Sequence, residues 1–399
     1  MMLLRSVFYW IIFPCFLQMN TYRELAKFND IVVNVICQED VSEYRKTSYG
    51  WTSKPELGKV NLEILPSEGW KDRVIKILEK NDTAIHVFGS ILPNYPEKIA
   101  YARDLAFSMG LKAGVITEAP INDETMLMRR IVKGLKNWQQ KYRIRKIAVR
   151  AQFVLAIPNS KYAYFHKLGW REDQIFPFGY FVVDLNSVQN SLPEWAKRVE
   201  GVDQSKFKIL YAGSFVAKKS PDLLVRALGL LHKKGSKFVC YLIGDGEQKD
   251  YLKELVKRSE LSDSVFFFGA RPNDQYRALM KACDVVVVPQ RRASWGVPAL
   301  EAIQSGIAVV ISDGDGASEL VKIGRAGRVF KSSNLQSLYK ALCDLLDNSV
   351  NLREAKNSAN FFAKRVHPTT MAKYLNDILL YIEGTYTEKP TVPWLESFF

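Results

Sequence analysis

The sequence is constrained most by one stretch of its C-terminal half, where an apolar run, a polar loop, a helix-compatible run and a second apolar run follow one another. Residues 285–288 are four consecutive valines, which is typical of a fully buried parallel strand. The helix-compatible run ends near Gly306, and residues 307–311 supply the next strand. This order is one βαβ unit, so we expect a parallel sheet. The loop 289–296 then lies at the carboxyl end of a strand, where open α/β sheets bind their ligands.

The same loop carries features that suit an anionic ligand. Trp295 and Gly296 open the predicted helix, and the free N–H groups of a first helical turn can receive an anion. Glu301 lies about a turn and a half further along, from where it can reach the same crevice. The alternative is an ordinary helix glutamate, and the spacing after Gly296 favours a carboxylate that binds hydroxyl groups.

Length and composition indicate a globular chain with an anionic partner. With 399 residues, two domains are expected, and 47% hydrophobic and 25% charged residues exclude a disordered chain. The five cysteines are scattered and odd in number, without metal-ligand spacing, which favours a reduced, cytoplasmic protein with no structural metal. The net charge of +14 favours nucleotide phosphate, a lipid surface or nucleic acid as partner.

The first half alternates between strand and helix patterns. Residues 7–17 are compatible with a signal peptide or with a buried strand that ends at Pro14, and the strand is favoured because no small-residue cleavage site follows. Further strands are expected at 31–36, 60–65, 84–88, 113–116, 151–157 and 174–178. Helices are expected through 23–27, near 70–80 and near 99–110. No run approaches the length of a transmembrane span. This pattern predicts an α/β domain.

Residues 129–150 interrupt that pattern with nine basic residues and no acidic residue. Apolar residues recur there at roughly helical spacing, although Gly134 weakens the helix. A basic amphipathic helix suits an anionic membrane surface, and the residues expected to contact it are Arg129, Arg130, Lys133, Lys141 and Arg145. The alternative is the solvated basic face of an ordinary surface helix. Nucleic acid is disfavoured, because no recognised nucleic-acid motif accompanies the stretch.

The second half has its own alternation. Residues 184–201 are interpreted as a linker, followed by strands at 208–212, 238–243 and 265–268 and a helix at 221–229. A helical region near 360–382 and an aromatic tail at 394–399 end the chain. The predicted division is an N-terminal domain of residues 1–185, a C-terminal domain of 186–375 and a tail of 376–399 that returns to the N-terminal domain.

Three glycine turns each follow a strand of the second half, at Gly213, at Gly244-Asp-Gly246 and at Gly269. Glycine lets the backbone approach a ligand closely. One such turn is weak evidence, and Gly244-Asp-Gly246 lacks the third glycine and ribose carboxylate of a dinucleotide fingerprint. Three turns in one domain are more specific.

Two lysines follow the first glycine turn. Lys218 and Lys219 precede a helix that Pro221 opens, so an ammonium group lies near a helix N-terminus, and both features attract phosphate. The alternative is a solvated lysine pair.

These motifs occur in an order and at spacings that resemble a known family. Gly213-x5-Lys219, Gly244-x-Gly246, Gly269, residues 295–302 and Ser312-Asp313-x2-Gly316-x2-Glu319-Leu320 are similar to the donor-binding half of a retaining, family-four (group 1) glycosyltransferase. The resemblance covers about 207–335. It is weaker over 1–185, where Pro14-x3-Gln18 and Tyr22-Arg-x-Leu25 resemble the first loop and helix of bacterial polysaccharide members. It implies the GT-B fold, in which two Rossmann-like, doubly wound α/β domains face a cleft.

The resemblance also implies roles for single residues. Lys219 would hold the diphosphate of a nucleotide sugar and Glu301 the ribose hydroxyls, and these two form the expected catalytic set. Gly269 and Arg271 would border the base. The remaining expected donor contacts are Gly213, Ser214, Lys218, Gly244, Arg292, Ser294, Trp295, Gly296, Val297 and Leu300. On the acceptor side the expected residues are Gln18, His86 and Glu118.

Two positions depart from the family's pattern. Ala293 stands where the first acid of the family's Glu-x7-Glu pair is expected, and Ser214 replaces an arginine that often follows the first glycine. Lys218, Arg291 or Arg292 would then supply the second phosphate-binding cation.

The function implied by the resemblance is transfer of a sugar from a UDP- or GDP-linked donor, without a metal ion. The acceptor would be a glycan or a lipid-linked glycan in surface polysaccharide or lipopolysaccharide synthesis, at the inner face of the cytoplasmic membrane. The alternative is a catalytically silent GT-B-like subunit that binds a glycan or a nucleotide, and Ala293 favours it. A nucleotide-sugar epimerase of related fold would use cleft histidines and acids, for which His86 and His166 give little support.

Overall fold

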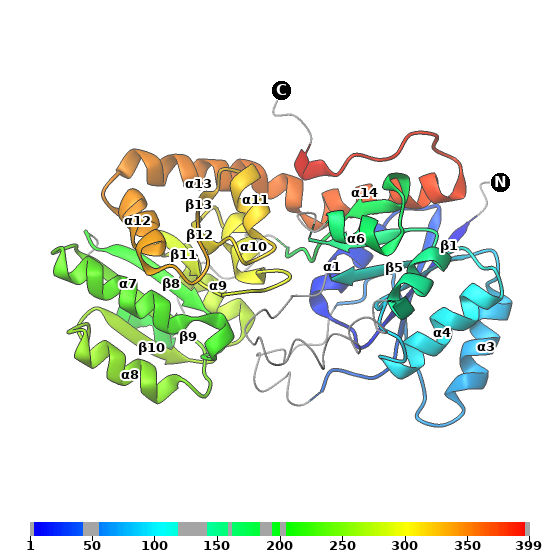
Figure 1. The fold of residues 1–399 in the computed structure, drawn as a ribbon, viewed down its shortest axis with the longest axis horizontal. Coiled ribbons are helices and arrows are strands. Elements are labelled where there is room, and N and C mark those ends of the chain that lie inside the picture. Colours follow the sequence, from blue (N-terminus) through cyan, green and yellow to red (C-terminus); the bar gives the residue numbers. More distant parts are fainter. Residues whose placement is uncertain are drawn as a thin grey trace. The chain divides into compact units, whose positions relative to one another are not determined.

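The protein consists of two compact units, each with its own parallel sheet (Figure 1). The computed structural model describes residues 4–42, 56–118, 142–158, 162–183, 194–199 and 205–395. The N-terminal unit comprises residues 1–41, 54–180 and 368–399, and the C-terminal unit comprises 181–367 together with 42–53. Each unit is described below by itself.

The N-terminal unit is built on seven strands in the order β3-β2-β1-β4-β5-β6-β7, and all neighbouring strands are parallel. The strands are β1 (Arg5–Ile11), β2 (Ile31–Cys37), β3 (Asn61–Ile64), β4 (Ile85–Phe88), β5 (Ala113–Glu118), β6 (Val154–Ile157) and β7 (Ile175–Pro177). The order reverses at β1, which lies between β2 and β4. Such a reversal is the topological switch point of a doubly wound sheet.

Helices cover both faces of this sheet. One face packs against α3 (Trp70–Lys80), α4 (Glu97–Ser108), a helix over 142–150 and α6 (Tyr162–Leu168). Phe8 and Trp10 of β1 point into that layer. Tyr9 between them stacks on Tyr22 of α1 (Phe16–Leu25), with ring centres 3.9 Å apart, so α1 covers the opposite face. Helix α14 (Pro368–Glu383) packs on α1.

The strand interpretation of the first apolar run is confirmed. Residues Arg5 to Ile11 pair in register with β2, residues Val7 to Trp10 pair with β4, and the side chains of residues 7–11 are buried. A central strand needs apolar residues on both faces, which explains why this run is continuous rather than alternating.

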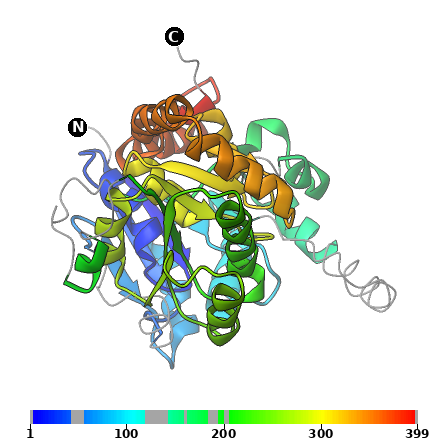
Figure 2. The ribbon, with the colours of Figure 1, turned by 90° about the vertical axis from the view of Figure 1, so that its left-hand side faces the viewer.

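The C-terminal unit has six parallel strands in the order β10-β9-β8-β11-β12-β13. They are β8 (Phe207–Ala212), β9 (Phe238–Ile243), β10 (Val265–Gly269), β11 (Val285–Val288), β12 (Ala308–Ser312) and β13 (Gly327–Phe330). Helices α7 (Pro221–Lys233), α8 (Lys249–Arg258) and α12 (Leu335–Leu346) form one layer, in which α7 lies beside both of the others (Figure 2). Helix α10 (Val297–Gln304) packs on β11 and β12.

The helical region predicted near 360–382 contains two helices that belong to different units. Helix α13 (Ser349–Ala363) ends in a 3₁₀ turn, and Pro368 opens α14 in its first turn, a position that proline tolerates. The units therefore divide at 180/181 and 367/368, rather than at 185/186 and 375/376, and the whole of α14 lies in the N-terminal unit.

The described part of the basic stretch is a surface helix. Ile144, Ile147 and Ala148 are buried in the core of the N-terminal unit, whereas the basic side chains of this helix are exposed, namely Arg143, Arg145, Lys146 and Arg150. Over 142–150 the apolar face is thus occupied by the protein core and is not free for lipid, which agrees with the solvated-face alternative. Arg129, Arg130, Lys133 and Lys141 lie outside the described residues.

Among the helices that are described, none combines the length and the apolar character needed to cross a bilayer.

Candidate active site

The three predicted glycine turns lie side by side at the carboxyl edge of the C-terminal sheet. The N–H of Gly213 donates to the carbonyl of Ile243 over 3.0 Å, and the N–H of Gly244 donates to the carbonyl of Gly269 over 2.9 Å. Gly244 has a φ of 149°, and a Cβ on it would lie 2.0 Å from the Gly213 carbonyl oxygen. Any side chain at position 244 would collide with the neighbouring Gly213 turn, so glycine is required there. Through these hydrogen bonds the three turns form a continuous rim of backbone, the glycine rim.

Lys219 follows Gly213 of this rim by six residues, at the end of the short 3₁₀ turn Ala217–Lys219 and just before α7. Its side chain is half-buried, and its Nζ donates to Oε1 of Gln290 over 2.5 Å. Burial lowers the pKa of Lys219, the carboxyl of Asp315 opposes that shift, and Lys218 adds to it by repulsion. Lys218 itself is exposed. The structure therefore provides one desolvated ammonium group, rather than an equivalent pair.

Gln290 and Asp315 complete a buried polar network that the sequence did not indicate. Gln290 is 3% exposed and Asp315 1% exposed, and Nε2 of Gln290 donates to Oδ2 of Asp315. Oδ1 of Asp315 accepts from the N–H of Ala317 over 2.8 Å. Burial raises the pKa of Asp315 to about 6. The only sequence signals were that Gln290 lies in the loop 289–296 and that Asp315 lies between two glycines, Gly314 and Gly316.

Helix α10 begins after Gly296, as the sequence predicts. A Cβ on Gly296 would lie 2.3 Å from Oδ2 of Asp315, so glycine allows the carboxyl group of Asp315 to lie against the N-terminus of α10. Trp295 is nearly buried and meets the ring of Phe181 edge-on, with centres 6.2 Å apart. Leu300 is fully buried, so it supports the helix from the core. A direct donor contact by Leu300 does not fit this position.

Glu301 is fully buried, and each of its two carboxylate oxygens accepts a hydrogen bond. Nδ2 of Asn273 donates to Oε1 over 2.9 Å, and the hydroxyl of Tyr276 donates to Oε2. Both donors come from α9 (Asn273–Lys281). Burial raises the pKa of Glu301, while Arg277 and the two hydrogen bonds oppose the rise. A ribose hydroxyl would have to share these oxygens with Asn273 and Tyr276.

The position predicted to border the base is occupied by an aromatic and cationic cluster. The guanidinium of Arg271 lies 4.7 Å from the ring centre of Trp195, and Nε of Arg271 donates to the carbonyl of Phe268 over 2.9 Å. The indole N–H of Trp195 donates to Gln275 over 2.8 Å. The interpretation of 184–201 as a plain linker therefore needs correction: in its described part, 194–199, a 3₁₀ helix packs Trp195 onto the end of β10.

The other predicted donor residues lie on the same loops. Ser214 follows Gly213 and is half-buried, and its carbonyl accepts from the hydroxyl of Tyr211 over 3.0 Å. Arg292 is exposed, Ser294 is half-buried, and Val297 is the half-buried first residue of α10. These positions follow β8 and β11, which are neighbouring strands, so the structure brings them to one edge.

On the N-terminal unit, two of the predicted acceptor-side residues follow strands at the carboxyl edge. Gln18 lies in the first turn of α1, directly after β1, and is half-buried. Glu118 is the exposed last residue of β5 and lies close enough to Tyr180 to raise the pKa of that phenol further, in addition to the effect of burial.

His86 does not fit an acceptor contact. It is the second residue of β4 and fully buried. Its Nδ1 accepts from the indole N–H of Trp10 over 3.2 Å, and its Nε2 lies 3.1 Å from the carbonyl of Asn81. These partners require the neutral Nε2–H tautomer. His86 is therefore a satisfied core histidine, and its prediction as an acceptor residue is corrected.

Replacing His86 with glutamine should flatten the acid dependence of stability. Burial lowers the pKa of His86 from 6.5 to about 4, so between these values the unfolded chain binds the proton and the folded chain does not. Stability is therefore lost as pH falls through this window, by roughly 3 kcal/mol. Urea unfolding of both proteins at pH 4.5 and 7 measures the effect. Equal pH slopes for the two proteins would contradict it.

Within the described ranges, no three His, Cys, Asp or Glu side chains gather as a metal ion would require.

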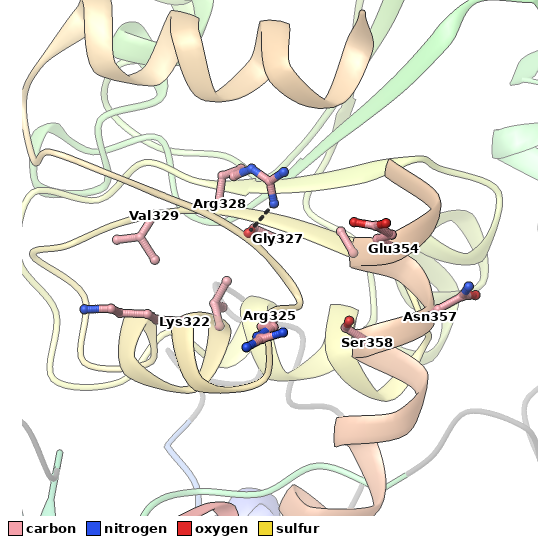
Figure 3. A pocket seen from close by; sticks show the side chains of 10 residues that line it. Lys322, Arg325, Gly327, Arg328, Val329, Glu354, Asn357 and Ser358 are labelled. Carbon is pink, nitrogen blue, oxygen red and sulfur yellow. Dashed lines mark hydrogen bonds between the residues drawn. The ribbon is translucent and has the colours of Figure 1, made fainter. Parts of the chain in front are cut away.

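A separate cavity of about 660 Å³ lies between α11 (Ser318–Ile323), β13 and α13 (Figure 3). Its charged lining residues are Lys322, Arg325, Arg328 and Glu354. Arg328 is already paired with Asp344 over 2.6 Å, and Lys322 and Arg325 are exposed. None of the predicted site residues lines this cavity.

Residues 194–361 match the model of the family described as Glycosyl transferases group 1. Two curated relatives cover part of this chain. One is a D-inositol 3-phosphate glycosyltransferase of Pseudarthrobacter chlorophenolicus, 33% identical over 149 residues, which are 36% of this chain and 36% of the relative. The other is the lipopolysaccharide core biosynthesis mannosyltransferase LpsB of Rhizobium meliloti, 30% identical over 178 residues, which are 42% of this chain and 49% of the relative. The chain thus spans half or less of the length of these relatives.

A solved structure extends the similarity to both units. The Anabaena protein Alr3699/HepE in complex with UDP superposes with a TM-score of 0.70 at 17% identity, covering 94% of this chain and all of that one. At this identity the likeness concerns the fold alone. The two Rossmann-like units thus have the GT-B architecture.

Proposed function

We propose that the protein is a retaining glycosyltransferase that moves a sugar from a nucleotide-sugar donor to a glycan or lipid-linked acceptor. The observation that carries the proposal is the desolvated ammonium of Lys219. It lies in the loop that Gly213 of the glycine rim opens, directly before the N-terminus of α7 and bonded to Gln290, which follows β11. A diphosphate is the ligand that this combination of cation, helix mouth and glycine backbone favours. The family match over 194–361 supports the same reading.

In the proposed reaction, the bond between the anomeric carbon and the diphosphate oxygen breaks while the acceptor hydroxyl bonds to the same face of the sugar. Negative charge grows on the leaving oxygen, and that oxygen takes the acceptor's proton. Lys219 stabilises the growing charge, and no carboxylate nucleophile is assigned. The Arg271–Trp195 cluster lies where the base is expected, and uridine is the first candidate, because the Anabaena protein is in complex with UDP.

The acceptor is proposed to belong to surface polysaccharide or lipopolysaccharide synthesis, because LpsB is a lipopolysaccharide core mannosyltransferase. Binding at the inner face of the cytoplasmic membrane is part of the proposal, supported by the exposed cations Arg143, Arg145 and Lys146 and the net charge of +14. Sedimentation with anionic and with neutral vesicles tests it, and equal binding to both would exclude this electrostatic attachment.

A panel of nucleotides and nucleotide sugars is expected to identify the donor by thermal stabilisation of the full chain. A ligand that binds only the folded protein at a hundred times its Kd adds about 2.7 kcal/mol of stability. UDP, UDP-glucose, GDP and GDP-mannose would be compared at equal concentration, with uridine and guanosine as controls without phosphate. At least one diphosphate should raise the melting temperature by several degrees more than its nucleoside does. No shift with any of them would overturn the proposal.

A catalytically silent subunit is the second candidate function. Two observations favour it: position 293 is alanine, and both oxygens of Glu301 are already bonded. Such a protein would be stabilised by the nucleotide but would neither transfer nor hydrolyse the donor sugar. Assaying purified protein for release of the nucleoside diphosphate separates the two candidates.

A further inference from the structure

Three side chains from three different loops are joined in series at the edge of the C-terminal sheet. Lys219 follows β8, Gln290 follows β11 and Asp315 follows β12. Nζ of Lys219 donates to Oε1 of Gln290 over 2.5 Å, and Nε2 of Gln290 donates to Oδ2 of Asp315. Lys219 is thus connected, through one amide, to a carboxyl group that is 1% exposed.

The order of donors and acceptors along this series is fixed by chemistry. An ammonium group only donates and an ionised carboxylate only accepts, whereas an amide has one end of each kind. Gln290 therefore satisfies both neighbours in one orientation only, with its oxygen toward Lys219 and its nitrogen toward Asp315. Because Gln290 is 3% exposed, water does not readily replace either partner.

Asp315 is held from its other sides by backbone groups. Oδ1 accepts from the N–H of Ala317 over 2.8 Å, and the carboxyl lies against Gly296 at the N-terminus of α10. Ala293, opposite Asp315 in an isolated bridge, brings no polar side chain. Among the described residues, Lys219 is the charged side chain that acts on Asp315, and the other contributions come from Ala317, Gln290 and the backbone of Gly296.

We propose that Asp315 is a positioning residue that acts through Gln290: its ionised carboxyl orients the amide and thereby holds the Lys219 ammonium in place for the phosphate groups of the donor. This inference rests on the proposed function, because it takes Lys219 as the phosphate contact. Asp315 itself touches neither donor nor acceptor in it.

Protonation of Asp315 disrupts the series. A neutral carboxyl carries an O–H that needs an acceptor, while both of its oxygens already accept from donors. The acceptor within the series is Oε1 of Gln290, so the amide turns and presents its N–H₂ to the ammonium of Lys219. Two donors then face each other and Lys219 loses its anchor. The pKa of Asp315, raised by burial to about 6, puts this change between pH 5 and 7. Phosphate binding is therefore strong above pH 6 and weakens as pH falls through 6.

The first arm of the test needs no ligand. The side-chain amide of Gln290 is observed by NMR in protein labelled with ¹⁵N-glutamine, and the signal is assigned from its absence in Gln290→Glu. In wild type it should shift with a midpoint near pH 6, and in Asp315→Asn that titration should vanish. An amide signal that does not titrate between pH 5 and 7, or that titrates equally in Asp315→Asn, overturns the proposal.

The second arm measures binding of UDP-glucose and GDP-mannose by calorimetry at pH 7.5 and 5.0. Neither diphosphate diester titrates in this range. The wild type should lose about tenfold in affinity at pH 5.0. Asp315→Asn should bind about tenfold more weakly at pH 7.5 and show no pH dependence. Wild-type affinity and pH dependence in Asp315→Asn would overturn the proposal.

A compensating double variant keeps the test independent of simple misfolding. In Gln290→Glu with Asp315→Asn, the new carboxylate accepts from Lys219 and the new amide donates to it, so the order of donors and acceptors is restored. This pair should recover affinity at pH 7.5 to within about threefold of wild type, whereas Gln290→Glu alone should not. If the double variant melts like wild type but does not recover affinity, Asp315 does not act on Lys219 through Gln290.

A matched control comes from the same loop. Asp313 is exposed, and its Oδ1 accepts from the N–H of Ser332 over 2.7 Å, which an asparagine can also do. Asp313→Asn should behave as wild type at both pH values, and a tenfold loss there would refute a specific role for Asp315. If no nucleotide sugar binds even the wild type, the proposed function fails. The NMR titration still tests whether protonation of Asp315 reorients Gln290.

Discussion

Replacing Lys219 with alanine is expected to lower turnover by about 10²–10³-fold, the usual loss when one preorganised donor to a developing negative charge is removed. Lys219 is the half-buried ammonium at the glycine rim, and burial already disfavours its charge, so an arriving diphosphate gains more from it than from a solvated lysine. Steady-state rates with the donor found in the nucleotide panel measure the loss. Affinity for that nucleotide should fall as well.

Lys218→Ala is the matched control. Lys218 is the neighbouring residue and is exposed, and its backbone carbonyl, which a substitution leaves intact, accepts from the N–H of Arg291 over 3.1 Å. The sequence also made Lys218 a candidate phosphate contact, but its ammonium is solvated, so its loss should change turnover by less than about fivefold. Wild-type kinetics in Lys219→Ala, or equal losses in the two variants, would exclude Lys219 as the specific phosphate contact. Melting curves of both variants show whether a loss of turnover comes from the removed ammonium group or from unfolding.

Replacing Gly244 with alanine is expected to destabilise the C-terminal unit by about 3 kcal/mol or more. Its φ of 149° is unfavourable for any side chain, and the new Cβ would lie 2.0 Å from the carbonyl oxygen of Gly213, so the two turns must separate. For a unit of this size the melting temperature should fall by roughly 6–12 °C. Calorimetry of the full chain measures the shift.

Gly269→Ala tests whether the turn contact or the backbone angle causes that loss. Gly269 also has a positive φ, 72°, but a Cβ there would meet no atom within 4 Å. It should cost only about 1 kcal/mol, the usual penalty for an L-residue in the left-handed region. If Gly244→Ala melts within about 2 °C of wild type, or no lower than Gly269→Ala, the interlocked rim is not a source of stability.

The sequence was most informative where one physical cause dominates a segment. Strands β9 and β11 and helix α3 have the predicted bounds, because continuous apolar runs mark buried parallel strands and apolar spacing marks a helix. The start of α10 after Gly296 was equally predictable, since a glycine with a proline two residues later, Pro298, is a local signal for a helix start. Local signals do not place a helix in a unit: the return to the N-terminal domain was predicted from residue 376, whereas the chain returns at Pro368, so the first half of α14 was assigned to the wrong unit.

The parts of the site that were missed depend on contacts between distant residues. Gln290 meets Lys219 across 71 positions and Asp315 across 25, and no local pattern encodes either contact. The hydrogen bonds that Glu301 accepts come from Asn273 and Tyr276, two polar residues of an amphipathic helix with no distinguishing spacing. His86 was misassigned because composition alone cannot tell a buried, fully bonded imidazole from one that faces a ligand.

The return of the chain at Pro368 affects the order in which the protein can assemble during synthesis. Residues 181–367 are contiguous, so the C-terminal unit is complete as soon as they have left the ribosome. The N-terminal unit, although translated first, is completed only by α14, whose Asn376 accepts from Arg5 of β1 over 2.7 Å. Until then α1 lacks the helix that packs on it. The C-terminal unit can therefore be completed before the N-terminal unit, which reverses the usual order of cotranslational folding.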